Sequence, residues 1–407
     1  MKSPLLSPTA FAIYIIFFAI GVIGALVLPS FSLFLASELK VRPLLVGIPF
    51  AGIAIASIVY NHALGGWSDR LQDRRKLIVL LCLLSCLACT IFALVRNYWF
   101  IALTATFIFS LSMVSFSQVL AYSLDYAEKN VSPERIPLFN AIVRAQIALA
   151  WVIGPPLGFI LVDTFGFSSS YFAAAGLALV LALAVLGCLP KLNKSASMSA
   201  QKKPNNLSPD DLDHHAKAKF WLPIKIDKSI IFCVLGFSLF WGVNNAYLIG
   251  LPIHLTENLG FAASWMGWVM GATAAIEVPF MIIAGLYAAR VSLIKLIYVA
   301  GAAAFLLYTG VFFATELWQL FALQLFNAAF IGILAGLGVS VIQILLPGES
   351  GRASALYTNT THMGNLLSSL LVSVIADIAG YREMFLVNVV LVIFAIVCFT
   401  RIRFPER

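Results

Sequence analysis

Residues 65–76 read GGWSDRLQDRRK, a polar stretch that separates two long apolar runs. A similar but shorter stretch, GLYAAR, occupies residues 285–290 and again follows an apolar run. Both fit the pattern G-x-x-x-x-R, and each comes after the second apolar run of its half of the chain. The sequence therefore predicts an internal duplication of a unit made of several apolar segments.

The composition does not fit a soluble globular protein. Of the 407 residues, 61% are hydrophobic and 11% are charged, whereas soluble globular proteins carry about 25% charged residues. The chain cannot cover itself with a polar surface, so we expect a lipid bilayer to cover it. The net charge of +8 is spread over loops between the apolar runs, as topology signals are, and does not predict nucleic-acid binding.

The apolar runs are long enough to cross a bilayer, which takes about 20 residues of helix. They lie near 10–36, 44–66, 76–95, 98–123, 138–162, 168–189, 229–256, 263–287, 292–313, 317–346, 353–376 and 384–402. A helix satisfies its own backbone hydrogen bonds in lipid, so all of them should be helical. We predict an all-α integral membrane protein with twelve transmembrane helices in two pseudo-symmetric six-helix bundles.

The basic residues predict the orientation. If the N-terminus is inside, the outside loops hold only Lys40, Arg42, Arg96 and Arg382. All other Lys and Arg residues, apart from Arg144, then lie in inside segments. Because cytoplasmic loops are enriched in Lys and Arg, we expect both termini in the cytoplasm and a multi-pass protein of the cell's inner membrane.

A long polar segment divides the chain. We predict an N-terminal bundle over 1–189, a cytoplasmic linker over 190–228 and a C-terminal bundle over 229–407. Duplicated six-span units are typical of secondary transporters, whose binding site lies near the membrane midplane between the repeats.

Two charged residues lie alone inside apolar runs, Arg144 in the fifth and Glu277 in the eighth. A charge at membrane depth costs at least about 2.5 kcal/mol, and such residues usually mark ion or substrate pathways. From the rise per residue of a helix, Arg144 lies about 9 Å and Glu277 about 15 Å from the cytoplasmic end of its span. We therefore expect Arg144 and Glu277 to take part in the function of the protein.

The stretch at 65–76 is similar to the signature cytoplasmic loop of the major facilitator superfamily, written G-x-L-A-D-R-x-G-R-R. The matching residues are Gly65, Asp69, Arg70, Arg74 and Arg75. The residues at 72–73 depart from the pattern around its usual glycine. The fifth run carries WVIGPPLG at 151–158, which is similar to the G-P-x-x-G motif of efflux-type members.

Further pieces resemble the bacterial sugar-efflux transporter (SET) family. They are RAQ at 144–146, AWVIGPP at 150–156, Trp241 with Asn244 and Tyr247, Met270-Gly271 with Glu277 and Pro279, and LQLFNA at 323–328. The pieces lie in both halves, so the resemblance covers essentially the whole chain. It implies a monomeric inner-membrane exporter of sugars and glycoside analogues that works by proton antiport and alternating access.

The superfamily resemblance also implies that the fifth and eighth spans face each other across the two halves. Arg144 and Glu277 would then be able to pair. We hypothesise that Glu277 carries the proton and that Arg144 is its switchable counter-ion, since a nearby cation favours the charged form of a carboxylate. The alternative is a static pair that only holds the halves together. His254 and His362 could also relay protons, but a lone histidine is more often a packing residue.

Sugar binding needs amides that read hydroxyl groups and aromatic faces for stacking. The candidate residues are Gln146, Trp151, Trp241, Asn244, Asn245, Tyr247, Gln324, Asn327 and Asn359. Trp241, Asn244 and Tyr247 share one helix face because they are three residues apart. Each of these residues could instead hydrogen-bond a neighbouring helix, an interaction worth about 0.6 kcal/mol.

Gate residues are expected near the loop at 65–76 and in the fifth span. The charged residues Asp69, Arg70 and Arg74 could pair with Asp125 or Glu128 at the inner end of the fourth span. Gly65 is a further expected gate residue. Gly154 and Pro155 should kink the fifth span, because proline removes a backbone hydrogen bond. The kink could act as a gate or only shape the transport path.

Three other interpretations compete with sugar export. A drug/proton antiporter of the same fold would need fewer amides and more bare aromatic faces, and a proton-coupled sugar importer differs only in direction. An enzyme or receptor would need a catalytic constellation or a large extramembrane domain, and the sequence offers neither. The sequence also contains no zinc motif and no phosphate-binding loop, so we expect no metal, no cofactor and no ATP-driven transport.

Overall fold

The computed structural model describes residues 5, 7–68, 73–192, 228–288, 290–347 and 349–402. Every regular element in these ranges is a helix. Eleven helical segments are long and apolar enough to cross a membrane, and a shorter apolar helix, Met384–Thr400, follows them. Most of the predicted linker, 193–227, lies outside the described residues, as do Asp69 and Arg70.

The helices of the first half follow the six predicted runs. They are α1 (Pro8–Leu33) with η2 (Phe34–Glu38), α2 (Pro43–Ser68), α3 (Arg74–Leu94), a composite fourth span, α7 (Ile136–Phe165) and α8 (Phe167–Cys188). The composite span consists of α4 (Tyr98–Leu103), η3 (Thr104–Phe109), α5 (Ser110–Ser112) and α6 (Ser115–Asn130). The short helix η4 (Pro133–Arg135) leads into α7.

The second half repeats this order. Its helices are α11 (Lys228–Ile253) with η5 (His254–Asn258), α12 (Ala263–Tyr287), α13 (Leu293–Phe313), α14 (Leu317–Leu345), α15 (Ser350–Ile378) and α16 (Met384–Thr400). The packing is repeated as well as the order. In the first half α1 packs on α7 and α3 on α8, and in the second half α11 packs on α15 and α13 on α16. The predicted duplication is therefore visible in three dimensions.

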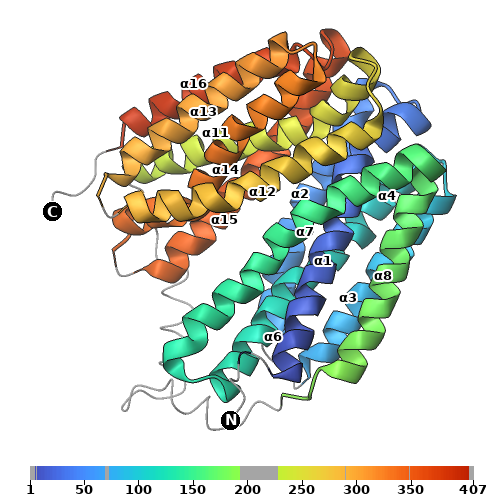
Figure 1. The fold of residues 1–407 in the computed structure, drawn as a ribbon, viewed down its shortest axis with the longest axis vertical. Helices are drawn as coiled ribbons and strands as arrows, with labels where there is room; N and C mark the ends of the chain where they lie inside the picture. Colours follow the sequence, from blue (N-terminus) through green and yellow to red (C-terminus); the bar gives the residue numbers. More distant parts are fainter. Residues whose placement is uncertain are drawn as a thin grey trace.

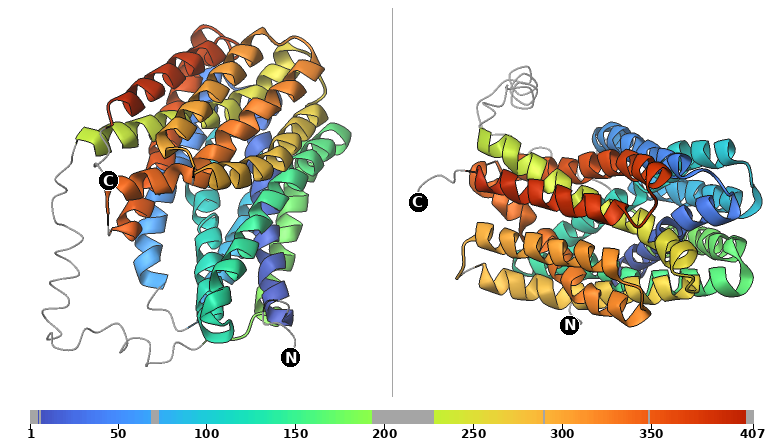
Figure 2. Two further views of the ribbon diagram at one scale, coloured as in Figure 1. Left: turned by 60° about the vertical axis from the view of Figure 1, so that its left-hand side comes forward. Right: turned by 90° about the horizontal axis from the view of Figure 1, so that it is seen from above.

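The two bundles meet at one end of the molecule and diverge toward the other (Figure 1). The start of α1 and the end of α16 lie on the side where the bundles diverge, which we call the termini face. The opposite end, which carries the short connections at residues 39–42 and 259–262, is called the far face. Figure 2 shows the same arrangement from two further sides. The most extensive contacts between the bundles are α7 with α12 and α2 with α15.

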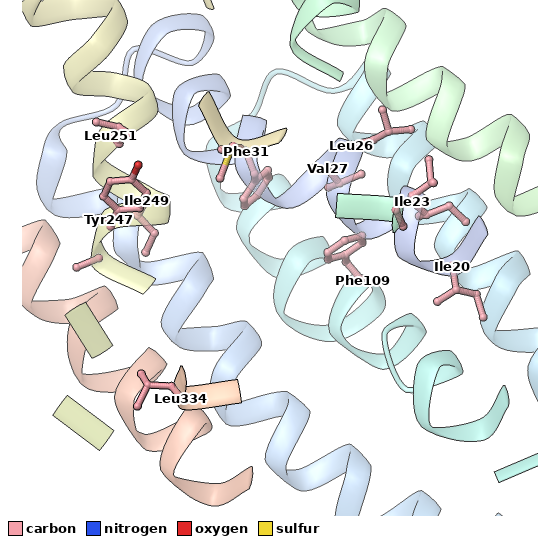
Figure 3. Close-up of a cluster of buried hydrophobic side chains, with 14 of the residues drawn as sticks. Ile20, Ile23, Leu26, Val27, Phe31, Phe109, Tyr247, Ile249, Leu251 and Leu334 are labelled. Carbon is pink, nitrogen blue, oxygen red and sulfur yellow. The ribbon is translucent and has the colours of Figure 1, made fainter. Parts of the chain in front are cut away.

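Buried apolar side chains hold the helices together inside each bundle. Figure 3 shows Leu26, Phe31 and Phe109 in the first half and Tyr247 and Leu334 in the second. All five are at most 5% exposed. In a bilayer the outer surface is also apolar, so helix association relies on close packing more than on removal of surface from water. Large apolar side chains on the outside, such as those in α8, suit contact with lipid.

Candidate functional site

The helices α7 and α12 cross where small residues bring their backbones together. A Cβ atom added at Gly267 of α12 would lie 2.7 Å from the carbonyl oxygen of Pro155, and one added at Gly271 would lie 2.8 Å from the carbonyl oxygen of Val152. Gly154 faces the other way, toward Ala25 of α1. The segment at 154–156 is thus enclosed by α1 on one side and α12 on the other, and α7 runs through it as a single helix.

Arg144 and Glu277 lie on these two crossing helices. The contacts at Gly267 and Gly271 show that α7 and α12 run antiparallel and which residues lie opposite one another. If this pairing is continued toward the termini face, Arg144 lies within about half a helical turn of the level of Glu277. Arg144 is exposed and Glu277 is partly buried. Within the described part of the chain no ion pair joins them. They therefore stand at similar heights on helices that diverge (Figure 1).

Three of the predicted sugar ligands meet in a buried hydrogen-bond network. The Oε1 atom of Gln324 accepts from Tyr247 Oη at 3.0 Å, from Thr273 Oγ1 at 2.6 Å and from Asn327 Nδ2 at 3.0 Å. Gln324 Nε2 donates to the carbonyl oxygen of Leu320. Gln324, Asn327 and Tyr247 are 0%, 3% and 2% exposed. In this conformation these residues bind one another and join α11, α12 and α14.

Asn245 is also engaged within its own half. Its Nδ2 atom donates to Ser368 Oγ at 2.8 Å and to Ser369 Oγ at 3.2 Å on α15. Trp241 and Asn244, one turn away on α11, are only partly buried. The ring of Trp241 packs edge-on against Tyr357, and its buried Nε1 atom has no hydrogen-bond acceptor among the described residues.

The other predicted ligands are more accessible. Gln146 and Trp151 of α7 are partly buried, and Asn359 of α15 is exposed. Gln146 donates one hydrogen bond to the carbonyl oxygen of Ile142 in its own helix, which leaves its amide oxygen available. The predicted ligands thus divide into an accessible set, made of Gln146, Trp151, Trp241, Asn244 and Asn359, and an engaged set, made of Asn245, Tyr247, Gln324 and Asn327.

The predicted gate residue Arg74 is buried at the termini face of the first half. Its side chain is 7% exposed, and its Nε atom donates to Asp125 Oδ2 at 2.9 Å. Its Nη1 atom donates to Ser68 Oγ at 3.1 Å and to Gln118 Oε1 at 3.4 Å. Arg74 therefore joins the end of α2 to α6. Gly65 lies within α2, while the predictions for Asp69 and Arg70 lie outside the described residues.

A second polar group beside this cluster was not anticipated. Asp73 caps α3, accepting from the backbone N–H of Arg75, and its carboxylate also receives two hydrogen bonds of 2.9 Å from the Arg75 side chain. Arg75 Nη1 donates in turn to the carbonyl oxygen of Leu189 at the end of α8. A signal was present in the sequence, because residues 72–73 depart from the family pattern around its glycine and aspartate is a preferred N-cap residue.

Asp73→Ala should lower the stability of the protein by about 1 kcal/mol, the usual effect of losing an N-cap. The hydrogen bond from Arg75 holds the pKa of the Asp73 carboxyl below its ordinary value. The Asp73 carboxylate therefore contributes fully to the stability of the folded protein above the pKa that this group has in the unfolded chain. The contribution is lost as the pH falls through its lower pKa in the folded protein. Thermal unfolding in detergent should show that Asp73→Ala is less stable than the unchanged protein at neutral pH. This difference in stability should disappear in acid. Asp73→Asn, which keeps a capping oxygen, should lose less.

The family model of the Major Facilitator Superfamily matches residues 13–315 and 243–407. "Sugar efflux transporter A" of Dickeya chrysanthemi is 35% identical over 97% of this chain and 96% of its own length. "Sugar efflux transporter B" of Salmonella typhimurium is 34% identical over the same shares of the two chains, and "Sugar efflux transporter C" of Escherichia coli is 34% identical over 98% of each.

Solved structures show the same fold at much lower identity. A bacterial homologue of the human lysosomal transporter Spinster, in an inward-facing and unoccupied conformation, superposes with a TM-score of 0.78 at 12% identity, covering 98% of this chain and 97% of that one. The nucleoside transporter NupG gives 0.76 at 14% identity, covering 98% and 99%. The chain therefore belongs to the major facilitator superfamily and, within it, to the sugar-efflux transporter family.

Proposed function

We propose that this transporter exports sugars or glycoside analogues across the inner membrane in exchange for protons. The observation that carries the proposal is the match, over nearly the full length, to sugar efflux transporters of three bacteria at 34–35% identity. A match over nearly the full length covers both halves and the helices between which superfamily members bind their substrates.

The termini face is proposed to be the cytoplasmic face. It carries Arg74, Arg75, Lys76, Arg290 and Arg352, whereas few basic residues lie on the far face. This distribution is the one that the positive-inside rule predicts for cytoplasmic loops. The bundles 1–189 and 229–407 would then be joined by a cytoplasmic linker over 190–228. The bundles meet at the far face and diverge at the termini face (Figure 1), which supports our proposal of an inward-facing state of a monomeric transporter.

Glu277 is proposed as the proton carrier. It lies 14 residues from the start of α12 and 10 from its end, so it is far from both membrane surfaces. The backbone of α12 is held firmly there, because a Cβ added at Gly332 of α14 would lie 3.0 Å from the carbonyl oxygen of Glu277. Closing the termini face would bring α7 and α12 together and Arg144 toward Glu277. The carboxylate would then gain a counter-ion in one state and lose it in the other, which couples its protonation to the state of the transporter.

The accessible set is proposed to contact the sugar directly. Amides of Gln146, Asn244 and Asn359 can read hydroxyl groups, and Trp151 and Trp241 offer faces for stacking on a sugar ring. The engaged set, Asn245, Tyr247, Gln324 and Asn327, is proposed to reach the sugar only after its hydrogen bonds rearrange. In the present state its hydrogen bonds join α11 to α12, α14 and α15, and α11 and α15 carry the accessible residues Trp241, Asn244 and Asn359.

The gate at the termini face is proposed to involve Gly65, Asp69, Arg70, Arg74 and Asp125. The Arg74–Asp125 pair belongs to one half, so it can orient the loop at 65–76 for contacts with the other half when the face closes. Gly154 and Pro155 are proposed to serve the opposite gate, because they lie in the segment where α7 meets α12, on the far-face side of Arg144.

Transport assays in inside-out vesicles test the function. An acidic vesicle interior should drive accumulation of labelled lactose or glucose analogues, because protons leaving the lumen are exchanged for sugar entering it. Collapse of the pH gradient with an ionophore should reduce the accumulation to the level of vesicles without the protein. Accumulation in right-side-out vesicles with an acidic exterior would instead identify a proton-coupled importer. Gradient-driven movement of hydrophobic cations without any sugar transport would identify a drug antiporter.

A further inference from the structure

A short motif, D-x-x-G, occurs at the far-face end of both halves. It reads DTFG at 163–166, where α7 ends, and DIAG at 377–380, where α15 ends. Gly166 and Gly380 both have positive φ angles, 81° and 109°, which favour glycine. Each glycine lies within two residues of the end of its helix and turns the chain there, and each aspartate stands three residues before its glycine.

The helices opposite these motifs also start in equivalent ways. The π-helical segments η2 and η5 end the preceding spans, and a residue with positive φ follows each, Lys40 at 49° and Gly260 at 73°. After this turn α2 begins at Pro43 and α12 begins at Ala263. Both halves therefore present the start of a helix to the D-x-x-G motif of the other half.

Each aspartate caps the helix of the opposite half. Asp163 Oδ1 accepts from the backbone N–H of Ala263 at 3.1 Å, and its Oδ2 accepts from that of Ser264 at 2.7 Å. Asp377 Oδ1 accepts from the backbone N–H of Leu44 at 3.4 Å. The first N–H groups of a helix have no partner within the helix and lie at the positive end of its dipole. The residue before α12 is Ala262, whose methyl group cannot cap the helix, so Asp163 supplies the acceptor from across the interface.

These caps lie about one turn from glycines at which the backbones of the two halves approach each other. Gly267 of α12 approaches the backbone of Pro155 and Pro156, and Gly47 of α2 approaches the backbone of Ser369. The Gly47 N–H also donates to Ser373 Oγ at 2.7 Å. If the far face opened, both caps would lose their partners, because each one joins α7 to α12 or α15 to α2.

We propose that Asp163 and Asp377 form a two-part latch that holds the far face closed and must be released each time that face opens. The latch presumes that the two halves move relative to each other, as in the proposed function. Its parts are unequal, since Pro43 has no N–H group and leaves Asp377 a single, longer hydrogen bond. Asp163 is therefore the stronger part.

Hydrogen–deuterium exchange of the purified, full-length protein in lipid nanodiscs tests the latch. The amides of Ala263, Ser264 and Leu44 report it directly, because they lack acceptors within their own helices. Asp163→Ala should speed exchange in the peptide over 261–268 by about 2- to 30-fold, the range expected for loss of an N-cap. If the two caps form one latch, exchange over 42–47 should also rise although Asp377 is unchanged. Asp377→Ala should raise the exchange rates of both peptides, 261–268 and 42–47, by a smaller factor than Asp163→Ala does.

Glu316→Ala is the matched control. Glu316 is a capping carboxylate at the start of α14, and it acts within one half. Its loss should leave exchange over 261–268 and 42–47 unchanged. A rise confined to 261–268 in Asp163→Ala would show an ordinary cap and would overturn the latch, as would no change at all. The assay uses neither sugar nor a proton gradient, so its outcome is independent of whether sugar/proton antiport is correct.

Discussion

Glu277→Gln is expected to abolish proton-driven sugar export while sugar exchange without a gradient continues. Glutamine has nearly the shape of glutamate but cannot take up and release a proton. If Glu277 links protonation to the movement of the halves, its loss removes the coupling free energy between proton and sugar, which is typically worth about 5- to 150-fold in affinity. Export against a sugar gradient should fall by a factor in this range, to the level of empty vesicles.

Two measurements separate the loss of coupling from the loss of the protein. Counterflow of labelled sugar, which needs no proton gradient, should persist in Glu277→Gln, because the accessible set of ligands is unchanged. Glu316→Gln, an equivalent change at an exposed position on the far face, should export normally. Arg144→Gln should retain counterflow and alter the pH dependence of export. Normal gradient-driven export by Glu277→Gln would rule out Glu277 as the proton carrier.

The sequence predicts the fold well because lipid imposes simple rules. Helices must satisfy their own backbone hydrogen bonds in the bilayer, so long apolar runs such as 138–162 correspond to helices such as α7. The all-helical, two-bundle fold and the family are confirmed. The π-helical ends η2 and η5 were not predicted, since nothing in the composition of residues 34–38 or 254–258 distinguishes them from α-helix.

The candidate site was harder to predict than the fold. Gln324 and Asn244 are both amides in apolar runs, yet one is the centre of a buried network and the other is accessible. Sequence position gives the depth of a polar residue but not its partners. Similarly, the depths of Arg144 and Glu277 are compatible with an ion pair, but their separation depends on the state in which the two halves are observed.

The far-face latch was missed for a different reason. Asp163 and Asp377 lie in the last turns of α7 and α15, where the helix dipole disfavours a carboxylate, but the sequence does not show which N–H groups they accept from. Only an alignment of the two halves shows that each is followed three residues later by a glycine. Asp73 was detectable as part of a departure from the family pattern directly before α3, where it is the N-cap residue.

Gly267→Val is expected to prevent the far face from closing and to stop transport. A Cβ atom at Gly267 would lie 2.7 Å from both the carbonyl oxygen of Pro155 and the Cα atom of Pro156. Both neighbours belong to the backbone of α7, so neither can rotate away as a side chain would. Overpacking of this kind costs about 1–3 kcal/mol, and here the cost falls only on the state in which α7 and α12 touch. The population of that state should fall by about 5- to 150-fold relative to the far-open state.

The distance across the far face and the rate of transport together measure this effect. Fluorophores placed through unnatural amino acids at the exposed positions Trp99 and Trp318, one in each half, should move apart in Gly267→Val. Export and counterflow should both fall, because each needs a complete cycle of the two gates. Gly285→Val provides the control on the same helix, since a Cβ there meets no atom within 4 Å. Unchanged distance and transport in Gly267→Val would mean that α7 and α12 do not need backbone contact to close the far face, and the glycine would then matter only for packing in this one state.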